Sequence, residues 1–283
     1  MSGAPDPLYV AARHILLDAL EALGDHREAV VLVGARAVYL RAGSGALAVA
    51  PYTTDADLAI DPGILASAPL LQDALEAAGF SRAGAEVGVW SKSAPIAGNE
   101  RAMVVDLLVP ESLGGRGRRG ARIPPHDRRA ARKVRGLEGA LVDKDLLRIP
   151  SLNDSDARAY QVFVAGPAAL LVAKTFKIAD RSGDSDRQSD KDALDVLRLL
   201  QAFPADELVR RMRFLLAHDA STAVASQGLA QFADQFGRPR GVGPTMAARA
   251  AVPLESEETV VASLSALARR LLDALADLRT GKP

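Results

Sequence analysis

The spacing of apolar residues changes repeatedly along the first half of the chain, which predicts helices and strands in alternation. Apolar side chains recur at helical spacing over 8–23, and this pattern predicts an amphipathic helix. The β-branched run Val30–Val33 predicts a short buried strand. A helix over 35–43 and a second strand over 53–60 are expected next. This order is typical of a fold in which helices cover a sheet.

The same patterns continue to about residue 165 and predict a small mixed sheet. The further elements are a helix over 64–78, strands near 87–90 and 103–109, and a hairpin-like segment over 140–149 and 160–164. The stretch 112–136 is rich in Gly, Pro and Arg, so we expect a mobile loop there, with a short helix at 128–135.

Helical spacing dominates from Gly166 to the end, apart from a polar stretch around 237–244. Pro167 stands where proline is favoured, in the first turn of a helix. The predicted fold class is therefore α+β: a mixed sheet flanked by helices over 1–165, with the basic loop 112–136, followed by a helical domain over 166–283.

Composition narrows the range of functions. The 283 residues include 48% hydrophobic and 25% charged residues, as in a globular protein that is soluble in water. The absence of cysteine excludes disulfides, thiolate metal sites and cysteine nucleophiles. No apolar run approaches the length of a membrane span, and the first residues lack the pattern of a signal peptide. We expect a cytoplasmic protein without a membrane partner.

Positive charge is concentrated in one segment of a chain whose net charge is zero. Residues 116–135 hold eight Arg and one Lys against one Asp, a local excess of 9 − 1 = +8. Such a block is either a solvated loop or a site for an anionic partner. Clustered Arg binds phosphate, so we expect a nucleic acid there, held by its backbone because no aromatic residue is interleaved. The candidate nucleic-acid-binding residues are Arg116, Arg118, Arg119, Arg128, Arg129, Arg132 and Lys133.

Two carboxylates stand one residue apart in the stretch TTDADLAI, at the start of an apolar run. Residues i and i+2 of a strand face the same way, so Asp55 and Asp57 are expected to lie side by side. Their repulsion is relieved either by water at a strand end or by a divalent cation. Carboxylate oxygens suit Mg²⁺ or Mn²⁺.

A third acid, Asp106, lies in the apolar run AMVVDLLV, where an isolated charge is costly. If its strand pairs with that of Asp55 and Asp57, the three acids form a metal site for phosphoryl or nucleotidyl transfer. The alternative is a lone acid at a strand end. Gly34 lies at a strand-to-helix turn about twenty residues earlier, where backbone N–H groups can approach a phosphate.

The second half of the chain adds a buried cation and two acids. Lys174 lies in a largely apolar helix and needs a partner, either a triphosphate or a carboxylate. Lys177 shares its face. The alternative is that both lysines extend to solvent. Asp192 and Asp195 share a helix face, and they either support a site or form a salt bridge with Lys191 or Arg198.

These motifs together resemble the polymerase-β-like nucleotidyltransferase superfamily. VLVGARAVYLRAG followed by TTDADLAI is similar to its signature of strand, Gly-Gly or Gly-Ser turn, helix, and strand with DxD. GPAALLVAKTFKIADR followed by SDKDALDVLRLL resembles the later motifs of the AbiEii-type nucleotidyltransferase toxins, the MenT-like group.

The resemblance implies a function and a role for each motif. It implies transfer of a nucleoside monophosphate from an NTP to the 3′ end of tRNA, within a toxin–antitoxin system that includes an antitoxin protein. Asp55, Asp57 and Asp106 would bind the metal, and Lys174 would bind the nucleotide with support from Asp192 and Asp195. The nucleotide site would also include Gly34, Ala35, Arg36, Thr53, Thr54 and Lys177.

One position departs from the family pattern, and two rival functions remain open. The second residue of the turn is Ala35 instead of Gly or Ser, which favours an inactive nucleotidyltransferase fold that binds RNA or a protein partner. The DxD motif also fits a nucleotide-sugar transferase, although only about fifty residues precede it. The four histidines show no ligand spacing.

Overall fold

The structure, a computed structural model, describes residues 6–43, 53–96, 98–180, 187–252 and 254–280. The chain divides into two compact units. Unit 1 comprises Met1–Arg36, Tyr52–Val134 and Lys144–Val164, and unit 2 comprises Ala37–Pro51, Arg135–Asp143 and Ala165–Pro283. Unit 2 thus contains two shorter stretches besides the C-terminal one, and a simple boundary after residue 165 stays a prediction.

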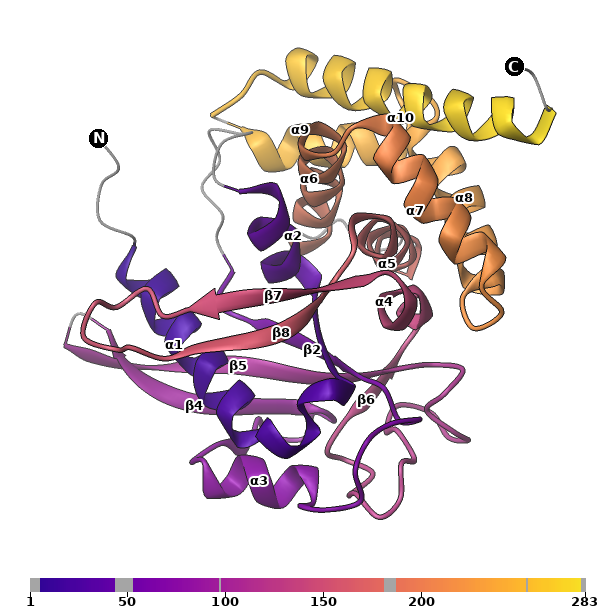
Figure 1. The fold of residues 1–283 in the computed structure, drawn as a ribbon. Coiled ribbons are helices and arrows are strands. Elements are labelled where there is room, and N and C mark those ends of the chain that lie inside the picture. Colours follow the sequence, from indigo (N-terminus) through magenta and orange to yellow (C-terminus); the bar gives the residue numbers. More distant parts are fainter. Residues whose placement is uncertain (1–5, 44–52, 97, 181–186, 253, 281–283) are drawn as a thin grey trace. The chain divides into compact units, whose positions relative to one another are not determined.

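Unit 1 is built on a mixed sheet, which confirms the predicted fold class (Figure 1). Its described strands are β1 (Val30–Val33), β2 (Ala56–Ile60), β3 (Ser81–Arg82), β4 (Val89–Ile96), β5 (Asn99–Pro110), β6 (Arg132–Val134), β7 (Lys144–Pro150) and β8 (Ala159–Ala165). They follow the order β3-β4-β5-β2-β1-β8-β7, and β6 pairs with β5.

The centre of this sheet is formed by the strands that carry the candidate acids. β2 pairs antiparallel with β1 and parallel with β5. Every residue of β1 is buried, as expected of a short apolar strand covered on both faces. β4 and β5 form a hairpin that is longer than the two predicted strands. A strand in the middle of a sheet is rigid, so a side chain at its end has a well-defined position.

Of two helices in unit 1, one matches its predicted range and the other is shorter than predicted. α1 (Pro7–Ala22) matches the predicted helix; Asp6 caps it by accepting the N–H of Leu8 at 2.7 Å, and it contacts β4 and β5. α3 (Leu71–Ala77) is much shorter than the helix predicted over 64–78. Pro69 explains the late start, because a proline inside a helix has no N–H to donate.

The segment 112–136 is tied to the sheet, and the short helix expected at 128–135 is wrong. Its residues Arg132–Val134 form β6, which runs parallel to β5. The buried indole of Trp90 donates from Nε1 to the carbonyl of Ala130 at 2.9 Å. His126 Nδ1 accepts the N–H of Leu71 at 3.1 Å. These tertiary bonds, together with the pairing of β6 with β5, compete with local helix formation, and Arg132–Val134 form a strand where the helix was expected.

Unit 2 is helical in its described C-terminal part, as predicted. After the short α4 (Glu138–Val142), its helices are α5 (Pro167–Asp180), α6 (Arg187–Ala202), α7 (Ala205–Ala217), α8 (Thr222–Phe236), α9 (Val242–Ala251) and α10 (Glu257–Thr280). α5 packs against α4, α6, α7 and α8, and α9 packs against α6 and α10 (Figure 1). α2 (Gly34–Ala42) begins in unit 1, and the 3₁₀ helix η1 (Gly24–Ala29) precedes β1.

The start of α5 is fixed by a buried carboxylate. Asp143 accepts the N–H of Ala169 at 3.1 Å and pairs with Arg211 Nη1 at 2.7 Å. A Cβ on Gly166 would lie 2.0 Å from Asp143 Oδ1, so only glycine leaves room for the carboxylate there. A negative charge at this end also complements the helix dipole.

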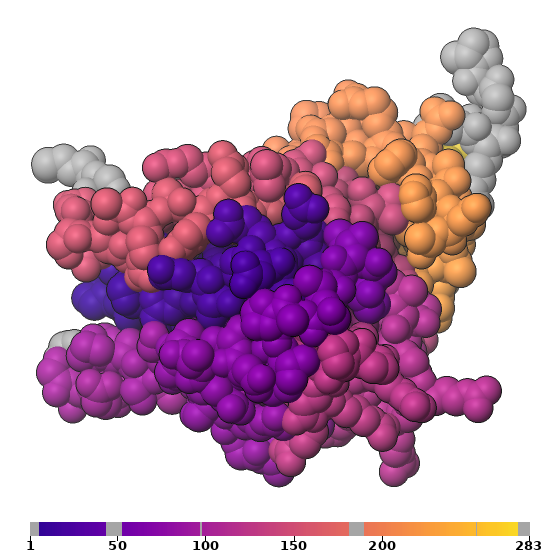
Figure 2. Space-filling view, turned by 60° about the horizontal axis from the view of Figure 1, so that its bottom comes forward, coloured from indigo at the N-terminus to yellow at the C-terminus, as the bar shows by residue number. Residues whose placement is uncertain are grey.

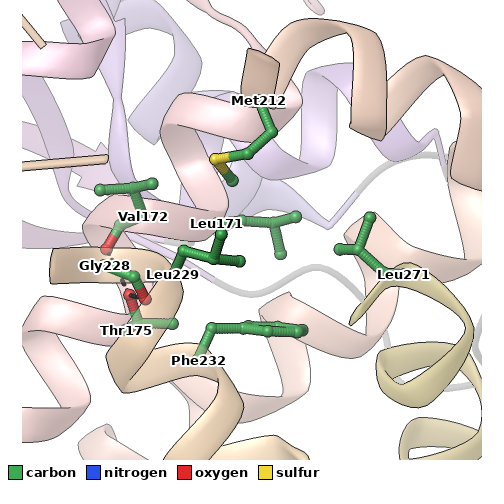
Figure 3. A pocket seen from close by; sticks show the side chains of 8 residues that line it. All are labelled: Leu171, Val172, Thr175, Met212, Gly228, Leu229, Phe232 and Leu271. Carbon is green, nitrogen blue, oxygen red and sulfur yellow. Dashed lines mark hydrogen bonds between the residues drawn. The ribbon is translucent and has the colours of Figure 1, made fainter. Parts of the chain in front are cut away.

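An apolar cavity lies among α5, α7, α8 and α10 (Figure 3). Its lining includes Val172, Met212, Phe232 and Leu271, and the hydroxyl of Thr175 donates to the carbonyl of Val172 at 2.7 Å. With no charged side chain in the lining, this cavity is a packing defect of the helical core and has no groups for catalysis.

No helix in the described part of the chain is long and apolar enough to cross a membrane.

Candidate active site

Asp57 and Asp106 are neighbours on two paired strands, and this pairing was the condition for a site that both acids share. β2 and β5 run parallel, and their register pairs Asp57 directly with Asp106. On the other side of β2, Asp57 is opposite Val33. Side chains in register on paired strands point to the same face of the sheet. The sheet therefore brings these two carboxylates together.

Gly34 leaves the space that the side chain of Asp57 occupies. It has φ +69°, and a Cβ added to it would lie 1.9 Å from Oδ2 and 2.8 Å from Cγ of Asp57. The turn from β1 to α2 thus needs glycine for two reasons: its backbone is left-handed, and the carboxylate lies against it. Gly34 was predicted from its position before the acids, and the structure places it in direct contact with one of them.

Replacement of Gly34 by alanine is expected to destabilise unit 1 and to displace Asp57. The left-handed backbone costs about 1–2 kcal/mol for a residue with a side chain, and the clash adds about 1–3 kcal/mol. Gly43→Ala is the matched control, because Gly43 has φ +68° and a Cβ there would meet no described atom within 4 Å. Chemical denaturation measures both variants, and an equal loss in the two would show that Asp57 can move aside at no cost.

Asp55 lies one residue before β2, so the strand begins later than the predicted range 53–60. β2 begins at Ala56, and Asp55 is exposed just before it. The hydroxyl of Thr54 donates to Asp55 Oδ1 at 3.0 Å, and the N–H of Asp55 approaches Thr53 Oγ1 at 3.4 Å. The two threonines therefore shape the entry to β2, and their hydroxyls lie beside the first acid.

The buried side chain of Arg36 holds the residues before β2 in place through hydrogen bonds. The residue is 1% exposed, and its guanidinium donates to the carbonyl of Thr53 at 3.3 Å and to that of Asp55 at 3.4 Å. It lies over the ring of Tyr9 at 5.9 Å, and Nη1 is buried without a hydrogen-bond partner. Burial and, after it, the charge of nearby Arg13 lower the pKa of Arg36 to about 10. Together with Ala35, Arg36 forms the first turn of α2, directly after Gly34.

Asp106 is held at one oxygen and left free at the other. Its side chain is 14% exposed, and Oδ2 accepts from Arg132 Nη2 at 2.5 Å. Oδ1 is buried and has no hydrogen-bond partner. Burial raises the pKa of Asp106 above its ordinary value, the charge of Asp57 adds to this, and Arg132 opposes both. A carboxylate in such surroundings is suited to accept a proton or a cation.

The carboxylate oxygens at this site determine whether it could bind a metal ion. Among the described residues, no three Asp, Glu or His side chains are grouped to hold a metal ion. Asp57 and Asp106 nevertheless offer hard oxygen donors on adjacent strands, and Oδ1 of Asp106 lacks any other partner. This donor pair fits Mg²⁺ or Mn²⁺. The three-acid site that also includes Asp55 stays a prediction.

The candidate nucleic-acid-binding residues fall into two groups. Arg116, Arg118, Arg119, Arg128 and Arg129 are exposed. In Figure 2 side chains of this magenta-pink segment project from the lower right of the face in view. Arg132 and Lys133 are less exposed and are engaged within unit 1: Arg132 binds Asp106, and Lys133 Nζ donates to the carbonyl of Gly115 at 3.1 Å.

Lys174 forms a buried ion-pair cluster in unit 2. Its ammonium binds Asp192 Oδ1 at 2.6 Å and Asp195 Oδ2 at 2.7 Å, and Asp195 also pairs with Arg198 at 2.8 Å. Lys174 is 3% exposed. Burial disfavours its charge, but the two carboxylates outweigh burial and raise the pKa of Lys174.

Lys174 is thus paired with carboxylates, one of the two kinds of partner expected from the sequence, the other being a triphosphate. Lys177 is more exposed and lies 3.4 Å from Asp192 Oδ1. The pairing of Asp195 with Arg198 is one of the two salt bridges considered from the sequence. The nucleotide-binding roles of Lys174 and Lys177 stay predictions, as do the supporting roles of Asp192 and Asp195.

Two features of the site were missed in the sequence. The contact of Arg132 with Asp106 joins residues 26 positions apart, and no local pattern distinguishes Arg132 from its basic neighbours. The burial of Arg36 could have been noticed, since it starts a helix next to a fully apolar strand. The sequence assigns Arg132 to nucleic-acid binding by its charge, whereas the family resemblance assigns Arg36 to the nucleotide site.

Comparison with known proteins identifies the family. A family model described as "Nucleotidyltransferase" matches residues 12–221, a range that contains Gly34, the three acids, the basic segment and the Lys174 cluster. No curated protein and no solved structure matches the chain significantly. The glycine turn, the paired acids on β2 and β5 and this match lead to one conclusion: the chain belongs to a nucleotidyltransferase family and is a transferase enzyme by that membership.

Proposed function

We propose that the protein transfers a nucleoside monophosphate from an NTP to a hydroxyl of RNA. The observation that carries the proposal is Asp57 lying over Gly34 with Asp106 beside it in register. This arrangement puts two carboxylates next to a glycine turn at the start of a helix, where backbone N–H groups suit a triphosphate. Family membership supplies the reaction class.

In the proposed reaction, the hydroxyl oxygen of the acceptor forms a bond to the α-phosphorus of the NTP. The bond from this phosphorus to the bridging oxygen breaks, and pyrophosphate leaves with the electron pair. The hydroxyl proton passes to solvent water as the new bond forms, and Asp106 Oδ1, an acceptor without another partner, is left to bind the cation. Mg²⁺ or Mn²⁺ bound by Asp57 and Asp106, with Asp55 beside them, would supply charge neutralisation of the phosphates.

Other residues of unit 1 have binding roles in this proposal. The turn of Gly34 and Ala35 and the hydroxyls of Thr53 and Thr54 would bind the triphosphate. Arg36 would act through the segment that it fixes, since its guanidinium binds the carbonyls of Thr53 and Asp55. The exposed arginines of the basic segment would hold the RNA backbone.

The finer assignment follows from the sequence resemblance. We propose tRNA as the acceptor, through its 3′ end, and a role as the toxin of an AbiEii-type toxin–antitoxin system in the cytoplasm, with a protein antitoxin as partner. The resemblance of the segments around the DxD motif and around Lys174 to that group supports this assignment.

The test is label transfer from each ribonucleoside triphosphate to total RNA, with Mg²⁺, with Mn²⁺ and with EDTA. We expect one nucleotide to label RNA in the tRNA size range, and EDTA to abolish the transfer. Labelled RNA of another size would rule out tRNA as the acceptor but would still support nucleotide transfer to RNA. No transfer with any nucleotide or metal would contradict the reaction itself.

A second candidate is an inactive member of the family that binds RNA or a protein partner. Two observations favour it: Ala35 in the turn, and Arg132 bound to Asp106, where a cation is expected in an active enzyme. Salt-sensitive RNA binding without metal-dependent NTP binding would support this candidate over the enzyme.

A further inference from the structure

Arg132 differs from the other arginines of the basic segment in the direction of its side chain. β6 pairs parallel with β5, and Arg132 is in register with Leu108. Asp106 precedes Leu108 by two residues, so all three side chains belong to the same face of the sheet. β6 therefore places the guanidinium beside Asp106, with the side chain 36% exposed.

The charge of Arg132 is used inside unit 1. Nη2 lies 2.5 Å from Asp106 Oδ2, and Nε is buried without a partner. A guanidinium already bound to a carboxylate gains less from a phosphate than a free one does, because the carboxylate is then left unpaired. This separates Arg132 from Arg119, which is exposed and lies in the same basic segment.

The contact decides which oxygen of Asp106 is available. With Oδ2 held by Arg132, the carboxylate cannot rotate freely about its Cβ–Cγ bond. Oδ1 is the oxygen that remains without a hydrogen-bond partner. An oxygen donor that is fixed in this way needs no reorganisation when the cation and the triphosphate arrive.

We propose that Arg132 is a positioning residue of the transfer reaction, which binds Asp106 at Oδ2 so that Oδ1 stays free for the cation that Asp57 and Asp106 would share. The inference rests on the proposed function. It reassigns Arg132 from the nucleic-acid-binding surface, where its charge alone had placed it, to the support of an acid that would bind the cation.

The experiment compares Arg132→Gln and Arg132→Lys with Arg119→Gln in the full-length protein. For each variant, kcat and the KM for acceptor RNA are measured by label transfer, and the Kd for the same RNA is measured without metal or NTP. We expect Arg132→Gln to lower kcat by about 10- to 100-fold with KM and Kd changed by less than about twofold. Arg132→Lys keeps the charge but not the planar fork, and should recover part of kcat.

The control should show the opposite pattern. Arg119→Gln should raise both Kd and KM, and lower the slope of log Kd against log salt by about one. If Arg132→Gln raises Kd as Arg119→Gln does and leaves kcat unchanged, the inference is wrong and Arg132 is an RNA contact. If Arg132→Gln fails to fold, the lysine variant decides by the same criteria. If the wild-type protein transfers no label, the proposed function fails and the inference falls with it.

Discussion

Replacement of Asp57 by asparagine is expected to abolish nucleotide transfer and to leave the fold intact. Asparagine has the shape of aspartate, so it fits the space over Gly34 that the carboxylate occupies. It removes the negative charge that faces Asp106 in register and that would bind a cation or stabilise the transferring phosphate. Loss of one preorganised electrostatic group costs about 10²–10³-fold in kcat, and we expect at least this loss.

The unfolding temperature separates this effect from damage to the structure. The charge of Asp57 raises the pKa of Asp106, so its removal relieves a repulsion and the unfolding temperature should not fall. Asp61→Asn is the matched control, because Asp61 directly follows the other end of β2. Asp61 accepts the N–H of Gly63 at 2.9 Å, and the side-chain oxygen of asparagine can accept the same N–H. Full activity in Asp57→Asn would exclude the proposed site.

Replacement of Lys174 by methionine is expected to destabilise unit 2 more than any other single change considered for this protein. Methionine keeps the length of the side chain but leaves Asp192 and Asp195 without the ammonium that both bind. Removal of one partner from a buried ion pair costs about 3–5 kcal/mol. Urea denaturation, followed by circular dichroism of the helices, measures this loss in the free energy of unfolding.

An exposed ion pair provides the control for Lys174. Arg210 and Asp206 pair at 2.7 Å on the surface of α7, with side chains 66% and 75% exposed. Arg210→Met should leave the free energy of unfolding nearly unchanged, because solvent screens such a pair. If Lys174→Met folds as stably as the wild type and instead loses affinity for NTP, the nucleotide-binding role predicted from the sequence would be supported over a structural one.

Much of the architecture could be predicted because it depends on local patterns. The apolar run Val30–Val33 forms β1, and helical spacing before it forms α1. Pro167 starts α5, as its fixed backbone angle favours. Predictions failed where distant residues compete with local preference: β6 replaces a short helix, because pairing with β5 satisfies the backbone of Arg132–Val134.

For the candidate site, the residue types and their order along the chain could be read from the sequence. It placed a glycine before two acids and a third acid in a later apolar strand, and these local features depend only on spacing and burial cost. Which of these residues lie in contact depends on how the sheet and the helices pack. Sheet register pairs Asp57 with Asp106 and leaves Asp55 before the strand, while β6 brings Arg132 to Asp106 and the helices of unit 2 enclose Lys174 with its acids. Strand pairing and charge burial join residues that are far apart in the chain. The spacing of residues along the sequence does not show which distant residues will pair.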